Sequence, residues 1–212
     1  RPPPAREDGS GTARRGAPTA AERAVVLALG LLDRPAAAPE LAGLAGLTTR
    51  CAARALRSLE RGGLVSRTEG ESGGEEWILA MAARPVVEAV PAREIRRLHR
   101  KIAVALERRV PDDSAPVEAV RHYVAAGRRP EVARLGLVAA ARLQSRFQHR
   151  AALEMYRTVL DALPGRFLGR RLDVALRIAD LHARLGDAGV EEGIRVLREM
   201  LPRSSRLPPA AR

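Results

Sequence analysis

Aromatic side chains are scarce in this sequence, and cysteine is almost absent from it. Phe, Trp and Tyr make up 2% of the 212 residues, although 46% of the chain is hydrophobic. The core must therefore be built from Leu, Ala, Val and Ile, which fill helix-on-helix interfaces without requiring polar partners. The single cysteine, Cys51, excludes an intramolecular disulfide and a multi-thiolate metal site, and it fits a reducing compartment. The composition therefore predicts a helical, cytoplasmic protein.

Long apolar runs are also missing. No stretch approaches the roughly 18 apolar residues of a membrane span, and the start has none of the features of a signal peptide. The helix expected over residues 92–109 is basic and amphipathic, a pattern that can lie on a membrane. Its apolar stripe lacks Trp and Phe, so we predict core packing and no membrane partner. The chain begins at Arg1 with Pro/Arg-rich ends, which we interpret as a piece of a longer protein.

Lysine is nearly absent as well, because Lys101 is the single lysine among 37 basic residues. The formal net charge of +12 would by itself direct such a protein to nucleic acid or another polyanion. The chain is also rich in Ala, Gly and Pro, a bias typical of GC-rich coding. Such coding favours arginine as the ordinary surface residue, so much of the arginine needs no binding function. Arginine still attracts phosphates at low salt, so DNA stays an open partner.

Motifs of enzyme chemistry are missing too. The phosphate-binding loop G-x-x-x-x-G-K-S/T does not occur, since Lys101 follows Arg100 inside a helical stretch. The four histidines lack the short spacing with carboxylates or cysteine that marks metal ligands, and we expect them to be structural. They are His99, His122, His149 and His182. Because no nucleophile, base and orienting group can be placed together, we predict no enzyme, no cofactor, no metal and no small-molecule substrate.

The first ordered region is expected to be a winged helix-turn-helix over residues 19–84, after a linker over residues 1–18. Thr19 and Glu22 have the spacing of a capping box and begin the first helix, which ends near Asp33. A second helix begins near Pro39 and is closed by Gly46. A third runs from Thr48 or Thr49, with Cys51 among its inward residues, to the Gly62-Gly63 pair. Two strands, residues 64–68 and 76–81, then form the small β-hairpin that serves as the wing.

The rest of the chain is expected to be mainly α, with connecting helices over residues 85–129 and antiparallel helical hairpins over residues 130–202. Residues 203–212 are predicted to be a disordered tail. Four positions have the small, aromatic, small and proline spacing of a tetratricopeptide second helix, and a degenerate copy follows them. These positions are Ala152, Tyr156, Val159 and Pro164, followed by Val190, Ile194, Leu197 and Pro202. Such hairpins must stack on one another to bury their apolar faces.

Arginines on the third helix are the strongest candidate site. Their spacing of four, three and four residues places them on one helix face, which in a DNA-binding winged helix enters the major groove. They are Arg50, Arg54, Arg57 and Arg61, and Arg67 in the first wing strand adds a possible backbone contact. Against this interpretation, the acidic residues of the wing would repel phosphates. These residues are Glu69, Glu71, Glu75 and Glu76.

Two segments resemble a known family. PAREIRRLHRKIAVALERR and APVEAVRHYVAAGRRPEVARLGLVAAA are similar to the region that follows the nucleotide-binding domain in bacterial STAND-type signalling ATPases. Those proteins include LuxR-type regulators and relatives that carry kinase or cyclase modules. The matching residues are Leu98, His99 and Arg100, then His122, Tyr123, Ala125, Ala126 and Gly127. The resemblance covers residues 19–202. Two parts of the family's proteins have no counterpart in this sequence, the nucleotide-binding domain and an output domain.

This resemblance implies a non-catalytic regulatory and protein-interaction segment. In the family the winged helix packs against the ATPase core and regulates it, and the helical hairpins offer a groove to a peptide or a partner protein. The alternative is a transcription factor whose winged helix binds DNA through the arginine face of its third helix.

Overall fold

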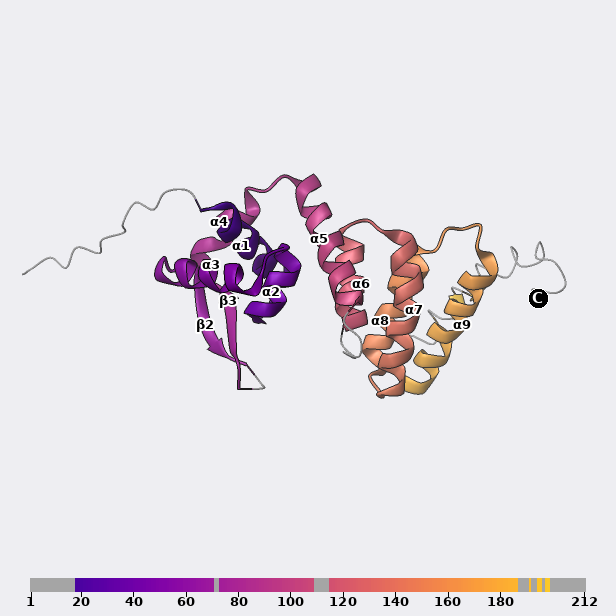
Figure 1. Ribbon diagram of the computed structural model, residues 1–212. Helices are drawn as coiled ribbons and strands as arrows, with labels where there is room; N and C mark the ends of the chain where they lie inside the picture. Colours follow the sequence, from indigo (N-terminus) through magenta and orange to yellow (C-terminus); the bar gives the residue numbers. More distant parts are fainter. Residues whose placement is uncertain are drawn as a thin grey trace, which may run out of the picture. The chain divides into compact units, whose positions relative to one another are not determined.

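The computed structural model describes residues 18–70, 73–108 and 115–186, together with residues 191, 194, 195, 197 and 198. The chain divides into two compact units, Arg1–Ala89 and Val90–Arg212 (Figure 1). The fold is mainly helical with one small antiparallel sheet, as predicted. Apart from Pro18, the predicted linker and the predicted tail lie outside the described residues, and the domain boundaries drawn from the sequence stay predictions.

Three helices begin the first unit where the sequence predicted them. They are α1 (Ala20–Leu32), α2 (Ala38–Ala45) and α3 (Thr49–Arg61). Thr19 and Glu22 form the complete capping box of α1, because each side chain bonds to the backbone N–H of the other. Gly46 ends α2 with a φ of 69°, a left-handed conformation that glycine adopts without steric cost.

A three-stranded antiparallel sheet completes the first unit. It contains β1 (Ala36–Ala37), β2 (Val65–Glu69) and β3 (Glu75–Leu79) in the order β1-β3-β2. The hairpin lies close to the predicted ranges, but β3 starts one residue earlier and ends at Leu79, since the 3₁₀ turn Met81–Ala83 follows. The sequence did not predict β1, because two alanines carry no strand pattern of their own and Ala36 is ordered by pairing with Trp77.

The core of the first unit comes from the inward faces of α1, α2 and α3. Its fully buried side chains include Val25, Val26, Leu29, Leu41, Leu56 and Leu59. Trp77 of β3 is also buried, so the sheet packs against the helices through its one large aromatic residue. Cys51 was expected to face inward, but it is only half-buried, because it lies in the first turn of α3 at the edge of this core.

Between residues 90 and 186 of the second unit, the described residues form five helices, and each packs against the next (Figure 1). They are α5 (Ala92–Glu107), α6 (Ala115–Ala125), α7 (Arg129–Ser145), α8 (His149–Ala162) and α9 (Leu168–Leu185). The short connections between α7, α8 and α9 produce the predicted array of helical hairpins. In α5 the burial is uneven, because Ile102 and Leu106 are buried whereas Ile95 and Leu98 are half-buried.

The repeat positions of α8 form its buried face. Ala152, Tyr156 and Val159 are each at most 1% exposed, and Pro164 follows the helix end. Two of the corresponding positions one repeat later, Val190 and Pro202, lie outside the described residues, so the second copy of the repeat stays a prediction.

A backbone conformation unusual for a bulky residue connects α7 to α8. Phe147 has a φ of 59°, in the left-handed region that favours glycine, and its side chain is 83% exposed. We expect Phe147→Gly to raise the free energy of unfolding by about 1 kcal/mol, because the strain disappears and little buried surface is lost. Urea unfolding followed by far-UV circular dichroism would measure the change, and a destabilised variant would contradict this account.

Candidate interaction site

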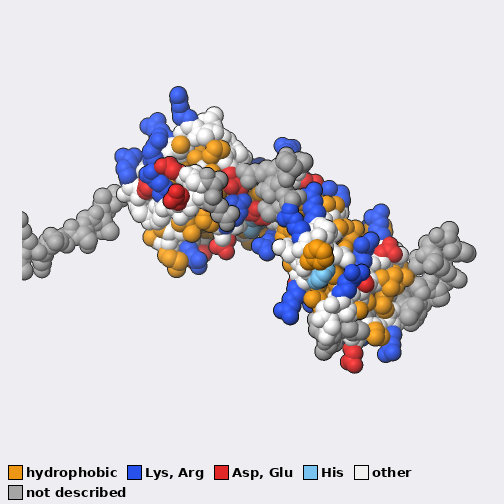
Figure 2. Space-filling view, turned by 90° about the horizontal axis from the view of Figure 1, so that it is seen from below, with side chains coloured by type: hydrophobic (Ala, Val, Ile, Leu, Met, Phe, Trp, Pro, Cys, Tyr) orange, Lys and Arg blue, Asp and Glu red, His pale blue; other side chains and the backbone are white. Residues whose placement is uncertain are grey.

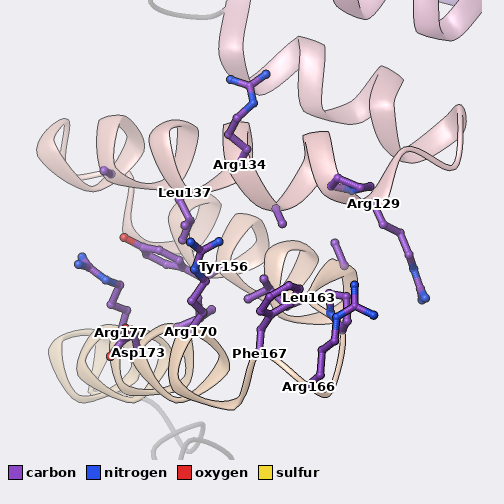
Figure 3. Close-up of a pocket in the computed structure, with 16 residues that line it drawn as sticks. Arg129, Arg134, Leu137, Tyr156, Leu163, Arg166, Phe167, Arg170, Asp173 and Arg177 are labelled. Atoms are coloured by element: carbon purple, nitrogen blue, oxygen red, sulfur yellow. The ribbon is translucent and has the colours of Figure 1, made fainter. Parts of the chain in front are cut away.

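A groove of about 770 Å³ lies among α7, α8 and α9 (Figure 3). Its volume falls in the range of sites that hold small ligands or a few side chains of a partner. Apolar side chains form much of its lining, and they come from all three helices and from the turn before α9. They include Leu137, Tyr156, Leu163, Phe167 and Val174. The groove therefore lies where apolar side chains of three consecutive helices and of one turn meet and stay partly open.

Tyr156 is the base of this groove. Its side chain is 1% exposed, and its hydroxyl donates a hydrogen bond of 3.3 Å to the Oε1 atom of Gln144. This bond satisfies the one polar atom of a large apolar side chain, which is the arrangement that a buried tyrosine requires. Tyr156 thus joins the end of α7 to α8 beneath the groove.

Arg171 fixes the turn between α8 and α9. Its Nη1 atom donates to the backbone oxygens of Leu160 and Leu163, each at 2.7 Å. Both carbonyls lie at the carboxyl end of α8, where backbone oxygens have no partner within the helix. The bonds hold the turn that carries Phe167, whose backbone N–H donates to the oxygen of Pro164 at 3.0 Å.

Arginine surrounds the apolar lining. The arginines that line the groove are Arg129, Arg134, Arg166, Arg170 and Arg177, and Asp173 is the single carboxylate among the described lining residues. The guanidinium carbons of Arg166 and Arg170 lie 5.1 Å and 5.8 Å from the centre of the Phe167 ring. The guanidinium carbon of Arg177 lies 6.0 Å from the ring centre of Tyr156. Cation–π contacts thus orient three of these side chains.

Arg134 differs from the other groove arginines, because its guanidinium pairs with Glu107 of α5. Figure 3 shows the Arg134 side chain turned away from α9. Glu107 also accepts a hydrogen bond of 2.8 Å from the hydroxyl of Tyr123. Burial and this bond raise the pKa of Tyr123 to about 12. Burial alone would raise the pKa of Glu107, but the hydrogen bonds from Tyr123 and Arg134 outweigh it and lower that pKa.

Two histidines meet between α5 and α6. The Nδ1 atoms of His99 and His122 are 2.8 Å apart, so one neutral ring donates a hydrogen bond to the other. His122 is 5% exposed and contacts His99 across the two helices, and its predicted structural role stays a prediction. Across the described part of the chain, no group of three or more His, Cys, Asp or Glu side chains could hold a metal ion.

This histidine pair predicts a loss of stability in acid. Burial lowers the pKa of His99 from its ordinary value of 6.5, so below that pH the unfolded chain binds more protons than the folded one. The contribution of His99 to the free energy of unfolding should therefore change little at neutral pH, and the protein should lose stability as the pH falls through 6.5 and below. Urea unfolding at a series of pH values would measure the slope. We expect His99→Asn to flatten it, and an unchanged slope would exclude this pair as its cause.

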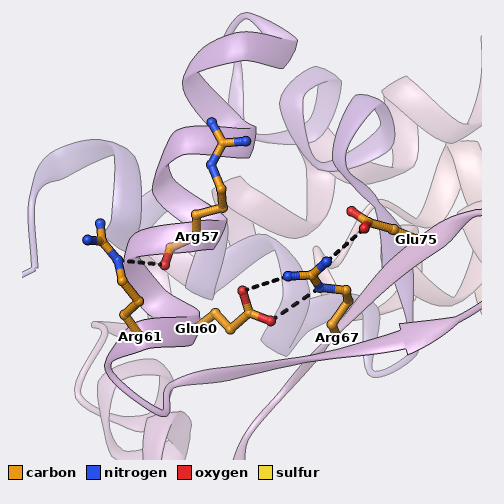
Figure 4. A network of polar contacts seen from close by, with 5 residues as sticks. All are labelled: Arg57, Glu60, Arg61, Arg67 and Glu75. Atoms are coloured by element: carbon orange, nitrogen blue, oxygen red, sulfur yellow. Dashed lines mark hydrogen bonds and ion pairs between the residues drawn. The ribbon is translucent and has the colours of Figure 1, made fainter.

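The predicted DNA-binding arginines of α3 differ from Arg67 in their surroundings. Arg50, Arg54, Arg57 and Arg61 are exposed on α3, and the Nε atom of Arg61 donates to the backbone oxygen of Arg57 at 3.3 Å. Figure 4 shows that Arg67 of β2 instead bridges Glu60 and Glu75, at 3.2 Å and 2.8 Å. Its guanidinium carbon also lies 5.4 Å from the ring centre of Trp77.

The partners of Arg67 change its electrostatic role. Hydrogen bonds with Glu60 and then Glu75 raise the pKa of Arg67, and the two carboxylates offset its positive charge. Glu60 was not predicted as a partner of Arg67, because its only signal in the sequence is an acidic residue near the end of a helix of basic character. On the face shown in Figure 2, Lys and Arg side chains are spread over both units and alternate with hydrophobic ones.

Comparisons with known proteins give one distant match. No family model and no curated protein matches the chain. Among solved structures, it is similar to a Signal Transduction ATPase with Numerous Domains (STAND) protein with a tetratricopeptide repeat sensor from Pyrococcus horikoshii. The TM-score is 0.45 and the sequence identity 14%, and the match covers 87% of this chain and 32% of that chain.

Among the described helices, none is both long and apolar enough to cross a membrane.

Proposed function

We propose that this chain is a cytoplasmic, non-catalytic regulatory and protein-interaction segment of a bacterial signalling ATPase or transcriptional regulator. The observation that carries the proposal is the groove among α7, α8 and α9, with its apolar base and its arginine rim. Stacked hairpins commonly offer such concave surfaces to an extended segment of a partner protein. The partly exposed Phe167 at this groove supplies the kind of aromatic contact that dominates protein interfaces.

The proposed mechanism is differential docking. The first unit would act as a winged helix that packs on a nucleotide-binding domain and restrains it. Partner binding to the groove can change activity only if the partner favours one arrangement of winged helix and ATPase over another. The ATP chemistry belongs to that other domain in this scheme, and the groove supplies the binding energy.

A selection of random linear peptides displayed on phage tests the protein-interaction part. We expect binders whose affinity falls about tenfold in Phe167→Ala and stays constant in Phe147→Ala, since both phenylalanines are exposed but only Phe167 lines the groove. Fluorescence anisotropy with the synthetic peptides would measure the affinities. Failure to select any peptide, or equal binding to both variants, would contradict the role of the groove.

The reading frame that precedes Arg1 tests the regulatory part. We expect it to encode a nucleotide-binding domain with a G-x-x-x-x-G-K-S/T loop. ATP hydrolysis by the longer protein should then change when a selected groove peptide is added. An initiator methionine directly before Arg1 would contradict this part of the proposal and leave a stand-alone binding protein.

DNA binding by α3 is the second candidate function. The observation that favours it is that Arg50, Arg54 and Arg57 are exposed and pair with no carboxylate among the described residues. Binding to duplex DNA, titrated with salt, would test it with the Arg54→Glu, Arg57→Glu double variant. Tight, sequence-dependent binding that this variant abolishes would favour a transcription factor. Weak binding indifferent to sequence would mark an ordinary polyanion-attracting surface.

A further inference from the structure

We propose that the groove takes an acidic segment of a partner protein, one in which Asp or Glu residues flank a large apolar side chain. This inference rests on the proposed function, because it names the chemistry of the partner that the groove would bind. Three features support it: unmatched positive charge, guanidinium groups held by aromatic rings, and an apolar base between them.

The charge of the groove is unmatched. Elsewhere in the described residues, arginines near a carboxylate pair with it. Examples are Arg34 with Glu40, Arg67 with Glu60 and Glu75, Arg128 with Glu131, Arg157 with Glu154, and Arg184 with Asp180. Like several exposed arginines of α3, four groove arginines have no carboxylate within ion-pair distance in the described part of the chain, but these four lie around one groove. They are Arg129, Arg166, Arg170 and Arg177. The single negative charge of Asp173 cannot balance the four positive charges of these arginines, so the groove attracts negative charge.

The aromatic contacts prepare these arginines for carboxylates. A guanidinium that lies over a ring uses its face for that contact and leaves the N–H groups at its edge free to donate. The guanidinium carbons of Arg166 and Arg170 both lie within 6 Å of the Phe167 ring centre, at 5.1 Å and 5.8 Å, and Figure 3 shows the guanidinium of Arg170 reaching towards the α7 side of the groove. Less side-chain entropy is then lost when a carboxylate binds, and bidentate hydrogen bonds become available to it.

The apolar base selects a peptide over a nucleic acid. Leu137, Leu163 and Val174 line the groove beside Phe167, and together they can bury a large aliphatic or aromatic side chain. Nucleic-acid bases would instead need an open aromatic face for stacking. Here guanidinium groups lie over Phe167 and Tyr156, and the latter is buried. A segment that combines carboxylates with an apolar residue uses both parts of this surface.

Labelled synthetic peptides test the chemistry directly. The probe is a fluorescein-labelled peptide of repeating Glu-Asp-Leu units, and its affinity for the full chain is measured by anisotropy at physiological salt. The first control peptide replaces Glu and Asp by Gln and Asn, and the second replaces Leu by Ser. We expect the probe to bind about tenfold more tightly than either control. Equal binding of the probe and the uncharged peptide would overturn the proposal.

Charge reversal in the groove is the matching test on the protein. We expect Arg166→Glu with Arg170→Glu to weaken binding of the probe at least about tenfold and to reduce its salt dependence. Arg121→Glu with Arg150→Glu changes the net charge equally at exposed positions outside the groove, and it should bind the probe as the original chain does. Circular dichroism would check that both variants are folded. Equal effects of the two double variants would overturn the proposal.

The outcomes separate this inference from the proposed function. Phage selection could yield uncharged peptides whose binding needs Phe167 but does not change in the Arg166→Glu, Arg170→Glu variant. The acidic partner would then be wrong, whereas the groove would still be a protein-interaction site. If no peptide of any kind depends on Phe167 or on the groove arginines, both proposals fail. If a single-stranded oligonucleotide binds more tightly than the probe and charge reversal abolishes its binding, the groove binds nucleic acid, which overturns the acidic peptide.

Discussion

Replacing Tyr156 by alanine is expected to lower the free energy of unfolding of the second unit by about 3–5 kcal/mol. Tyr156 is 1% exposed and is among the largest fully buried side chains of the described residues. Its removal leaves a cavity between α7 and α8, which the surrounding helices can fill only in part. Urea unfolding followed by far-UV circular dichroism would measure the loss.

Two controls make this result specific. Tyr156→Phe keeps the ring and removes only the hydroxyl that donates to Gln144, so it should cost about 1 kcal/mol. Trp77 is the single tryptophan of the sequence and lies in the first unit, so its fluorescence transition should stay in place in both variants. A loss below about 1 kcal/mol in Tyr156→Ala would contradict the packing described for α8.

The same substitution should also affect the groove while the variant is still folded. Tyr156 lines the groove, and the guanidinium of Arg177 lies over its ring. Without the ring, Arg177 loses the contact that orients it and the apolar base becomes deeper. Peptide affinity should therefore fall in Tyr156→Ala but stay close to the original value in Tyr156→Phe, which separates the packing role from the hydroxyl group.

Local signals in the sequence predicted most of the helices. Capping at Thr19 with Glu22 and the glycine at position 46 depend on residues a few positions apart, and the structure confirms these predictions. The buried face of α8 was also predictable, since the periodicity of Ala152, Tyr156 and Val159 alone defines it. These features need no knowledge of what lies across the interface.

The groove could not be predicted in this way. Arg166 lies in the turn after α8 and Arg170 in the first turn of α9, and nothing in their spacing distinguishes them from the many surface arginines of this chain. They become a pair only because Phe167 lies between them and because the turn places them opposite α7. Similarly, the pairing of Arg67 with Glu60 joins β2 to α3, so it depends on tertiary structure that no local pattern encodes.

Gly136→Ala is expected to destabilise the second unit by about 1–3 kcal/mol, although alanine is the better helix former. A Cβ atom at position 136 of α7 would lie 2.5 Å from the Cγ2 atom of Val159 of α8, and Val159 is fully buried. The two helices approach closely at this point only because residue 136 has no side chain. The clash must move a well-packed neighbour, and its cost exceeds the propensity gain of about 1 kcal/mol.

Gly169→Ala in α9 is the matched control, because a Cβ atom there would meet nothing within 4 Å. This variant should be unchanged or more stable by up to about 1 kcal/mol, since only the helix propensity changes. Urea unfolding followed by far-UV circular dichroism would compare the two variants. If both alanines stabilise the protein, α7 and α8 do not approach each other as closely at Gly136 as described.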